Sequence, residues 1–353
     1  MTVLKLGSLF DGIGVFPLAA MHCGMEPVWA SEIEARPISI TKRHFPDMLH
    51  LGDITKISGA EIPPVDVITF GSPCQDLSQI GTRNGFAGKK SSLFYQAMRI
   101  IEEMRYATNG RYPAFTVWEN VAGAFSSNDR LDFAAMLSAF TGAEVSVPPR
   151  GWAHAGMVRG GCADTAWRLL DAQYWGEPAL VQRRKRVFVV ADFAGQRAGE
   201  VLFKPRTVLP FSTISGPGGL SATQRGGVPA AQTGRQVPIV RPFSLRRMRT
   251  MAQVGDQKGF CASFGRGGEP FPTLLASVTA PFSFWYEGEE RDGFLRVLTP
   301  LECERLMGLP ENWTKYGCKN EEISDHARYR ALGNSIALPC AEYVMAGIAE
   351  VMN

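Results

Sequence analysis

The sequence lacks the spacings that mark metal sites and disulfide frameworks. Its seven cysteines are scattered, none stands in a Cys-x-x-Cys pair, and the five histidines show no ligand spacing. No apolar run reaches the length needed to cross a bilayer. Asp11 follows the first residues too soon for a secretory signal. We therefore expect a cytoplasmic protein with reduced thiols, no resident metal and no membrane contact.

Complete nucleotide-binding signatures are also missing. Residues 85–90 carry glycines and lysines but miss the P-loop pattern, which argues against a P-loop nucleotidase. Residues 10–14, Phe-Asp-Gly-Ile-Gly, follow an apolar run and precede a helical pattern, but they offer only Gly-x-Gly. A cofactor turn at a helix N-terminus and a plain strand–helix turn both remain open on this evidence.

Acidic residues are scarce in one part of the chain. The net charge of +3 is modest, but within residues 197–266 eleven basic residues are opposed only by Glu200 and Asp256. A local excess of this kind is typical of a surface that binds a polyanion, with a solvated basic face as the alternative. Residues 204–241 are also rich in Gly, Pro, Ser, Thr and Gln, which predicts a loop-rich segment.

Elsewhere short apolar runs alternate with helical patterns. We expect strands at residues 4–10, 27–30, 65–70, 114–118 and 187–191, and helices at 35–43, 92–105, 130–140, 300–307 and 337–351. This alternation predicts an α/β fold with a doubly wound, mostly parallel sheet. We expect a cofactor-binding catalytic domain at residues 1–191 plus 300–353 and a small loop-rich domain at 192–299. Residues 333–335, Gly-Asn-Ser, are expected to cap the last helix.

Reactive and acidic side chains follow the expected strands. Cys74 comes directly after the strand at 65–70 and a short turn, so its thiol is a candidate nucleophile; a buried structural cysteine is the alternative. Glu32 and Asp53 follow further strands, where carboxylates can bind a ribose and an adenine amine. Glu119 ends the strand at 114–118, beside apolar neighbours that would raise its pKa.

A basic run leads directly into the last expected strand of the first half. On an extended chain, Gln182, Arg184 and Arg186 share one face, and Arg183 and Lys185 share the other. A planar guanidinium suits a phosphate or a carbonyl oxygen. Basic clusters are usually solvated surface, but this one adjoins a core strand.

Taken in order, these motifs resemble the DNA (cytosine-5)-methyltransferases of the bacterial or phage modification type. The resemblance covers nearly the whole chain apart from about residues 192–296. It is carried by Ser8 to Gly14, Pro73-Cys74-Gln75 with Ser78, Ser92-Leu93-Phe94, Glu119-Asn120-Val121, Gln182-x-Arg184-x-Arg186, residues 296–313 and Gly333-Asn334-Ser335. The sequence departs from the family pattern at one place. Three residues separate Pro178 from Gln182, whereas the family places a proline immediately before this glutamine.

The resemblance implies a Rossmann-like S-adenosylmethionine-dependent methyltransferase domain with a small target-recognition domain. It implies roles for individual residues. The catalytic residues would be Cys74, Glu119, Arg184 and Arg186. The cofactor-binding residues would be Phe10, Gly12, Gly14, Glu32, Ile33, Asp53, Ile54, Pro73, Leu93, Asn334 and Ser335. The DNA-binding residues would be Gln75, Ser78, Arg83, Arg266, Thr273 and Leu274.

The implied activity is sequence-specific transfer of a methyl group from S-adenosylmethionine to carbon 5 of a flipped cytosine, through a covalent cysteine adduct. Double-stranded DNA is the expected partner of a monomer that acts on the bacterial nucleoid, with a companion restriction endonuclease as a functional partner. Three alternatives stay open: a tRNA cytosine-5 methyltransferase of the same family, a catalytically silent DNA-binding homologue, and a nicotinamide oxidoreductase. Against the oxidoreductase, the sequence contains no full Gly-x-Gly-x-x-Gly motif.

Overall fold

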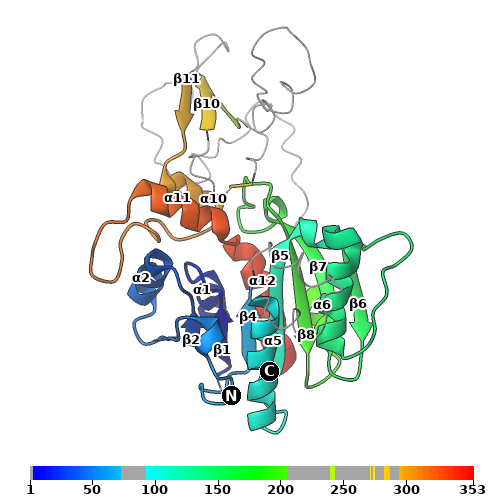
Figure 1. Ribbon diagram of the computed structural model, residues 1–353. Helices are drawn as coiled ribbons and strands as arrows, with labels where there is room; N and C mark the ends of the chain where they lie inside the picture. Colours follow the sequence, from blue (N-terminus) through cyan, green and yellow to red (C-terminus); the bar gives the residue numbers. More distant parts are fainter. Residues whose placement is uncertain are drawn as a thin grey trace.

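The computed structural model describes residues 3–72, 93–204, 239–242, 271, 273–274, 282–286 and 294–353 (Figure 1). Its strands are β1 (Lys5–Leu9), β2 (Glu26–Ser31), β3 (Leu49–His50), β4 (Val67–Phe70), β5 (Phe115–Val121), β6 (Ala155–Arg159), β7 (Asp164–Asp171), β8 (Lys185–Asp192), β9 (Ile239–Pro242), β10 (Phe282–Tyr286) and β11 (Phe294–Val297). Its α-helices are α1 (Val15–His22), α2 (Ala35–His44), α5 (Leu93–Ala107), α6 (Leu131–Thr141), α7 (Ala198–Leu202), α10 (Pro300–Leu306), α11 (Asp325–Asn334) and α12 (Leu338–Met352).

Eight strands form one sheet in the order β3-β2-β1-β4-β5-β8-β7-β6. The five strands from β3 to β5 are parallel, and β8, β7 and β6 continue the sheet with antiparallel pairings. The expected α/β class with a mostly parallel sheet is therefore confirmed. The carboxyl ends of the parallel strands point toward α10 and α11 (Figure 1).

At the antiparallel end of the large sheet, β6 and β7 were not expected from the sequence. In β6 every second residue is exposed, as in a strand at the edge of a sheet. In β7 both terminal residues are aspartates, Asp164 and Asp171, and Arg168 interrupts the apolar run. Neither segment has the continuous apolar pattern that marks a strand covered on both faces, so pairing with β8 decides their conformation.

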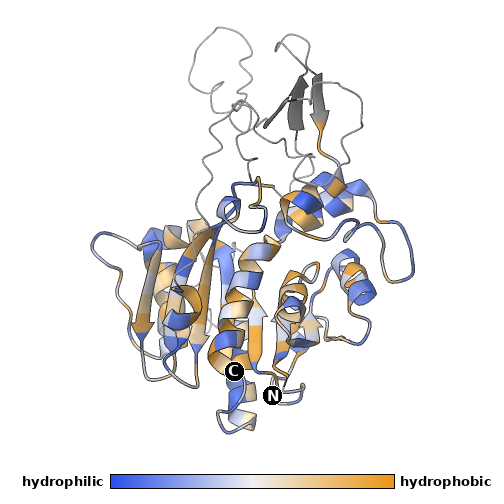
Figure 2. Cartoon of the chain, turned by 180° about the vertical axis from the view of Figure 1, so that it is seen from behind, coloured by the Kyte–Doolittle hydropathy of each residue, from blue (hydrophilic) through white to orange (hydrophobic). Residues whose placement is uncertain are grey.

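Helices cover both faces of the sheet. The buried residues of α5 and α6 pack on one face, and those of α1, α7 and α12 pack on the other, as the opposite views of Figures 1 and 2 show. Apolar spacing explains why α5 forms: Phe94, Ala97, Ile101 and Met104 recur on one side of the helix and are buried. The apolar faces that bury these helices against the sheet therefore also set their positions in the fold.

The small second sheet is antiparallel, in the order β11-β10-β9. β11 leads into α10, whose first turn is closed by a reciprocal capping box between Thr299 and Glu302. Residues 192–204 contain α7, which packs against α12 and β7. The expected boundary at residue 192 therefore falls too early, because these residues belong to the packing of the large sheet.

The region before the last helix also differs from expectation. Gly333 and Asn334 end α11, and α12 begins after Ala337, with no side-chain cap. Residues 333–335 therefore form a helix end and a connection rather than a cap, because a whole helix, α11, precedes them. No single helix of the described segments is long and apolar enough to span a membrane; α11 and α12 pass that test only as a pair, bent by 43°.

Candidate functional site

The adjacent ends of β4 and β5 form the centre of the candidate site. The backbone carbonyl of Ser72 accepts a hydrogen bond from the Asn120 side-chain amide at 3.0 Å. The Ser72 hydroxyl accepts one from the Trp118 indole N–H at 3.1 Å. These bonds fix the last described residue before the segment that contains Cys74. Gly71 leaves room for Glu119, because a Cβ at this position would lie 3.0 Å from its Oε2.

Glu119 and Arg186 form a buried ion pair. Val121 on β5 is the register partner of Arg186 on β8, so Glu119, two residues earlier, shares that face. The Nε of Arg186 lies 2.9 Å from the Oε1 of Glu119. Burial raises the pKa of Glu119, while the positive charges of Arg186 and Arg184 oppose that rise. The carboxyl group is therefore set up to hold a proton more readily than an exposed glutamate.

The predicted alternation of the basic run is confirmed. Gln182 and Arg184 are buried and Arg186 is largely so, whereas Arg183 and Lys185 are exposed. The three residues inserted after Pro178 do not disturb this register, because the Gln182 backbone forms a bridge with Phe271 and the chain then enters β8.

Arg184 connects three parts of the chain. Its guanidinium donates to the carbonyl of Leu274 at 2.8 Å, to that of Gly333 at 2.8 Å, and to that of Ser335. The side chain is 1% exposed, so these carbonyls replace water as its partners. Arg184 thus joins the start of β8 to the end of α11 and to the Thr273-Leu274 segment.

The glycine turn between β1 and α1 has room for a ligand. Phe10, Gly12 and Gly14 all have positive φ angles, of 54°, 60° and 79°. Among the described residues, apart from its two chain neighbours, no heavy atom lies within 4 Å of the place where a Cβ of Gly12 would be, so a ligand can approach the backbone here. The turn is tied to β2, because the Gly12 N–H donates to Oε2 of Glu32 at 2.9 Å.

The predicted cofactor residues that follow β2 and β3 form hydrogen bonds with their own neighbours in sequence. Oε1 of Glu32 accepts from the backbone N–H groups of Ile33 and Glu34. Ile33 is 73% exposed, an apolar surface that a flat ring would cover. Asp53 accepts from the backbone and hydroxyl of Thr55, and these hydrogen bonds lower its pKa.

Four further predicted cofactor residues differ in their exposure to solvent. Ile54 is buried, Leu93 and Ser335 are half-buried, and Asn334 is exposed. Thr273 and Leu274, predicted to bind DNA, lie beside the basic run. The Thr273 hydroxyl donates to the carbonyl of Arg183 at 2.6 Å, and Leu274 is buried. The remaining predicted site residues lie outside the described residues: Pro73, Cys74, Gln75, Ser78, Arg83 and Arg266.

Sequence reasoning gave Asp11 no role of its own. Both of its carboxylate oxygens are buried and accept no hydrogen bond of good geometry within the described parts of the chain, although the Ser8 and Thr41 hydroxyls lie close enough to oppose the rise of its pKa. Burial raises the pKa of Asp11 to about 7, and the neighbouring Glu32 carboxylate adds to the rise. Its place inside the Gly-x-Gly turn was the only available signal. With the open space at Gly12 and the exposed Ile33, this acid fits a site for a nucleoside cofactor.

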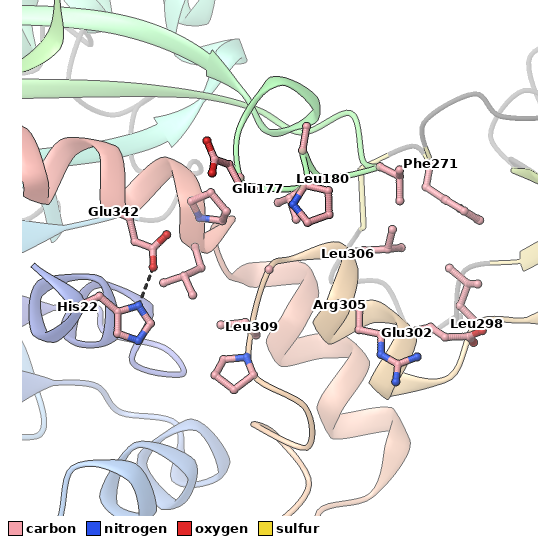
Figure 3. Close-up of a pocket in the computed structure, with 18 residues that line it drawn as sticks. His22, Glu177, Leu180, Phe271, Leu298, Glu302, Arg305, Leu306, Leu309 and Glu342 are labelled. Atoms are coloured by element: carbon pink, nitrogen blue, oxygen red, sulfur yellow. Dashed lines mark hydrogen bonds and ion pairs between the residues drawn. The ribbon is translucent and has the colours of Figure 1, made fainter. Parts of the chain in front are cut away.

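One cavity of the described residues lies away from this site. It has a volume of about 520 Å³ and lies between the loop at residues 176–181, α10 and the start of α12, with His22 and Glu342 paired at one side (Figure 3). Its lining is mostly apolar and includes neither Glu119 nor Glu32. Within the described ranges, no cluster of His, Cys, Asp and Glu could hold a metal ion.

Known proteins match this chain over most of its length. The family model for C-5 cytosine-specific DNA methylases matches residues 4–205 and 246–350. The chain is 27% identical to the Type II methyltransferase M1.ScrFI of Lactococcus lactis subsp. cremoris, over 99% of this chain and 78% of that protein. It is 23% identical to the Type II methyltransferase M.HhaI of Haemophilus parahaemolyticus, over 100% and 96%.

Another relative carries a different name. The chain is 24% identical to a DNA N-6-adenine-methyltransferase of Escherichia phage P1, over 98% of its own length. It spans only 61% of the length of that protein.

Solved structures share the fold. The Dnmt2 methyltransferase of S. pombe is similar with a TM-score of 0.58 and 15% identity, over 99% of both chains. The methyltransferase EhMeth of Entamoeba histolytica is similar with a TM-score of 0.61 and 13% identity, over the whole of both. With the family match over both halves of the sequence, the chain belongs to the C-5 cytosine-specific DNA methylases, whose methyl donor is S-adenosylmethionine.

Proposed function

We propose that this protein is a sequence-specific DNA methyltransferase that modifies carbon 5 of a cytosine flipped out of the duplex. The observation that carries the proposal is the buried Glu119–Arg186 pair, which lies next to the anchored residue Ser72, two positions before Cys74. At this edge of the sheet, an acid with a raised pKa and a guanidinium lie next to the residue after which the Cys74 segment begins.

The proposed chemistry begins with the cytosine ring, whose carbon 5 is too poor a nucleophile to react unaided. The Cys74 thiolate adds to carbon 6 and makes carbon 5 nucleophilic. Glu119 binds N3 and the exocyclic amine, and Arg186 binds the carbonyl oxygen, so both stabilise the charge that develops in the ring. S-adenosylmethionine supplies the methyl group. Loss of the proton from carbon 5 then expels the thiolate and restores the aromatic ring.

Residues around the glycine turn would hold the cofactor. Gly12 allows close approach of the ligand, Glu32 and Asp53 supply carboxylates, and Ile33 supplies an apolar surface. Phe10, Gly14 and Ile54 would shape the same pocket, and Leu93, Asn334 and Ser335 would line it from the start of α5 and from the end of α11. Pro73 remains a cofactor-binding prediction from sequence.

Arg184 would support this site through the backbone, without contacting the base. Its guanidinium makes hydrogen bonds to three backbone carbonyls, so its proposed part is to hold Arg186, residues 333–335 and the Leu274 segment in register. Base contact is assigned to Arg186, whose side chain faces Glu119.

Recognition of DNA is assigned to the basic segment, with a boundary moved to about residue 205, after α7. Lysines and arginines there would contact phosphates, while Arg266, Thr273 and Leu274 would lie near the bases, and Gln75, Ser78 and Arg83 would contact the flipped nucleotide. The enzyme would act as a monomer on nucleoid DNA in a bacterial cytoplasm, and its functional partner would be a companion restriction endonuclease.

A side-by-side methylation assay tests the proposal. The purified protein receives labelled S-adenosylmethionine with duplex DNA or tRNA, and the products are digested to nucleosides. We expect 5-methylcytosine in DNA. Methylated adenine would instead agree with the name of the phage P1 relative, label in tRNA would favour the RNA alternative, and no label with either substrate would favour a catalytically silent homologue.

Duplex DNA that contains 5-fluorocytosine tests the covalent step. The thiol adduct cannot lose the substituent at carbon 5, so the wild-type protein should stay attached to the DNA through denaturation. Methyl transfer without any trapped adduct would contradict the proposed role of Cys74.

A further inference from the structure

We propose that Trp313 is a positioning residue for the cofactor turn. Its indole N–H donates to the backbone carbonyl of Ile13 at 2.8 Å, across 300 positions of sequence. Ile13 lies between Gly12 and Gly14, in the turn whose backbone would face the cofactor. The inference rests on the cofactor role proposed above for that turn.

The indole is held on both sides. Its ring stacks on the ring of His44, with centroids 3.5 Å apart and planes 4° from parallel, and the edge of Phe45 packs at 6.1 Å. Nε2 of His44 lies 2.8 Å from the carbonyl of Trp313. Burial lowers the pKa of His44, so the ring is neutral near pH 7 and its Nε2–H tautomer donates to that carbonyl.

The buried Glu304 carboxylate fixes the backbone on either side of Trp313. Glu304 on α10 is 0% exposed, and its two oxygens accept from the backbone N–H groups of Asn312 and Thr314, each at 2.8 Å. These are the residues on either side of Trp313. Arg328 on α11 balances the charge, with Nη2 lying 3.1 Å from Oε1 of Glu304. The backbone around Trp313 therefore has little freedom to turn the indole away from Ile13.

The loop between α10 and α11, which contains Trp313, also forms hydrogen bonds to α2, which begins shortly after Glu32. Arg43 donates to the carbonyl of Gly317 and to the side chain of Asn320, and Ser39 donates to Glu321. Figure 1 shows this loop, between α10 and α11, passing beside α2. Through these contacts and the Trp313 hydrogen bond, the loop after α10 is attached to α2 and to Ile13 in the cofactor turn.

A net hydrogen bond of this kind contributes about a threefold to tenfold change in an equilibrium constant. Trp313→Phe keeps an aromatic ring beside His44 and removes the N–H donor together with part of the indole volume, a loss of volume that the control below shares. We expect its dissociation constant for S-adenosylmethionine to rise about threefold to tenfold, with the KM for the cofactor rising equally. At saturating cofactor, kcat should stay within about twofold, because the turn touches no reacting group on the base.

Trp167→Phe is the matched control. Trp167 is 6% exposed against 5% for Trp313, and its indole donates to the carbonyl of Ala153 at 3.0 Å, in a part of the fold that includes none of the cofactor residues. We expect it to lower Tm by an amount similar to Trp313→Phe and to leave cofactor affinity unchanged. Calorimetric titration of each full-length variant with S-adenosylmethionine, without DNA, gives the affinities.

Equal cofactor affinity in Trp313→Phe and wild type would overturn the inference while leaving the proposed activity intact. Absence of cofactor binding by the wild type would overturn both. If Trp313→Phe does not fold, His44→Phe answers the same question, since it keeps the stack and removes the bond to the Trp313 carbonyl. A rise in its dissociation constant supports the inference, and an unchanged value contradicts it.

Discussion

The Arg186 guanidinium and the Glu119 carboxylate lie 2.9 Å apart, on one face of the antiparallel pair β5 and β8. Both side chains are largely buried, and the pair adjoins the end of β4, from which the Cys74 segment departs. An acid and a cation that share a low-dielectric edge can respond to charge developing on a bound base. The first four predictions concern this edge and the residues that support it.

Glu119→Gln should reduce kcat by about 100-fold or more, because the amide cannot share a proton with N3 of the cytosine. The amide retains the size of the side chain, so Tm and cofactor affinity should change little. Labelled-methyl incorporation under saturating DNA and cofactor measures the effect. An unchanged kcat would remove Glu119 from the mechanism.

Gly71→Ala should slow catalysis by about tenfold without changing the residues that react. The added Cβ would lie 3.0 Å from Oε2 of Glu119 and would displace the carboxylate. Gly123→Ala is the control, because its Cβ would meet only a methyl group of Val121 at 3.7 Å. Steady-state kinetics of the two variants should therefore diverge, and equal rates would count against the importance of the Glu119 position.

Cys74→Ser should abolish methyl transfer and spare cofactor binding, since a serine hydroxyl is far less ionised than a thiol at neutral pH. Methyl incorporation and calorimetric titration of the same preparation separate the two effects. Turnover at the wild-type rate would show that the reaction does not use a covalent adduct.

Arg184→Met should destabilise the fold by on the order of 3 kcal/mol, because two buried carbonyls and a partly buried one lose their hydrogen-bond donor. Arg184→Lys should recover part of this stability, since an ammonium retains the charge but not the fork of donors. Urea unfolding of both variants measures the difference. A Met variant as stable as wild type would show that the carbonyls find other partners.

The stability of the free protein should depend on Asp11 between about pH 4 and pH 7. The pKa of Asp11 is raised from 3.8 to about 7 in the folded state, so the folded chain binds this proton more tightly than the unfolded chain. The stabilisation is complete below pH 4 and is lost as the pH rises toward 7. Asp11→Asn removes the titrating group, so the Tm of the variant minus that of wild type should increase over this range. A difference that stays flat with pH would refute the assignment.

The sequence by itself determined the strands of the parallel half and the order of the motifs along them. Runs such as 65–70 and 114–118 are apolar because both faces of a central strand are covered by helices, and this pattern can be read locally. Alternation in the basic run likewise predicted that Arg184 and Arg186 share one face and that Arg183 and Lys185 share the other, and the structure buries the first of these faces. The residues of the glycine turn and Glu119 followed from their places at strand ends.

Only the tertiary structure decided which distant groups meet. β6 and β7 become strands by pairing beside β8, although their own sequences carry charged residues in place of an apolar run. The partners of Arg184 lie 90 to 151 positions away, and Trp313 reaches Ile13 across 300. Such contacts depend on how helices and loops pack over the sheet. Local propensity and spacing carry no information about that packing, because each segment alone would fit many arrangements.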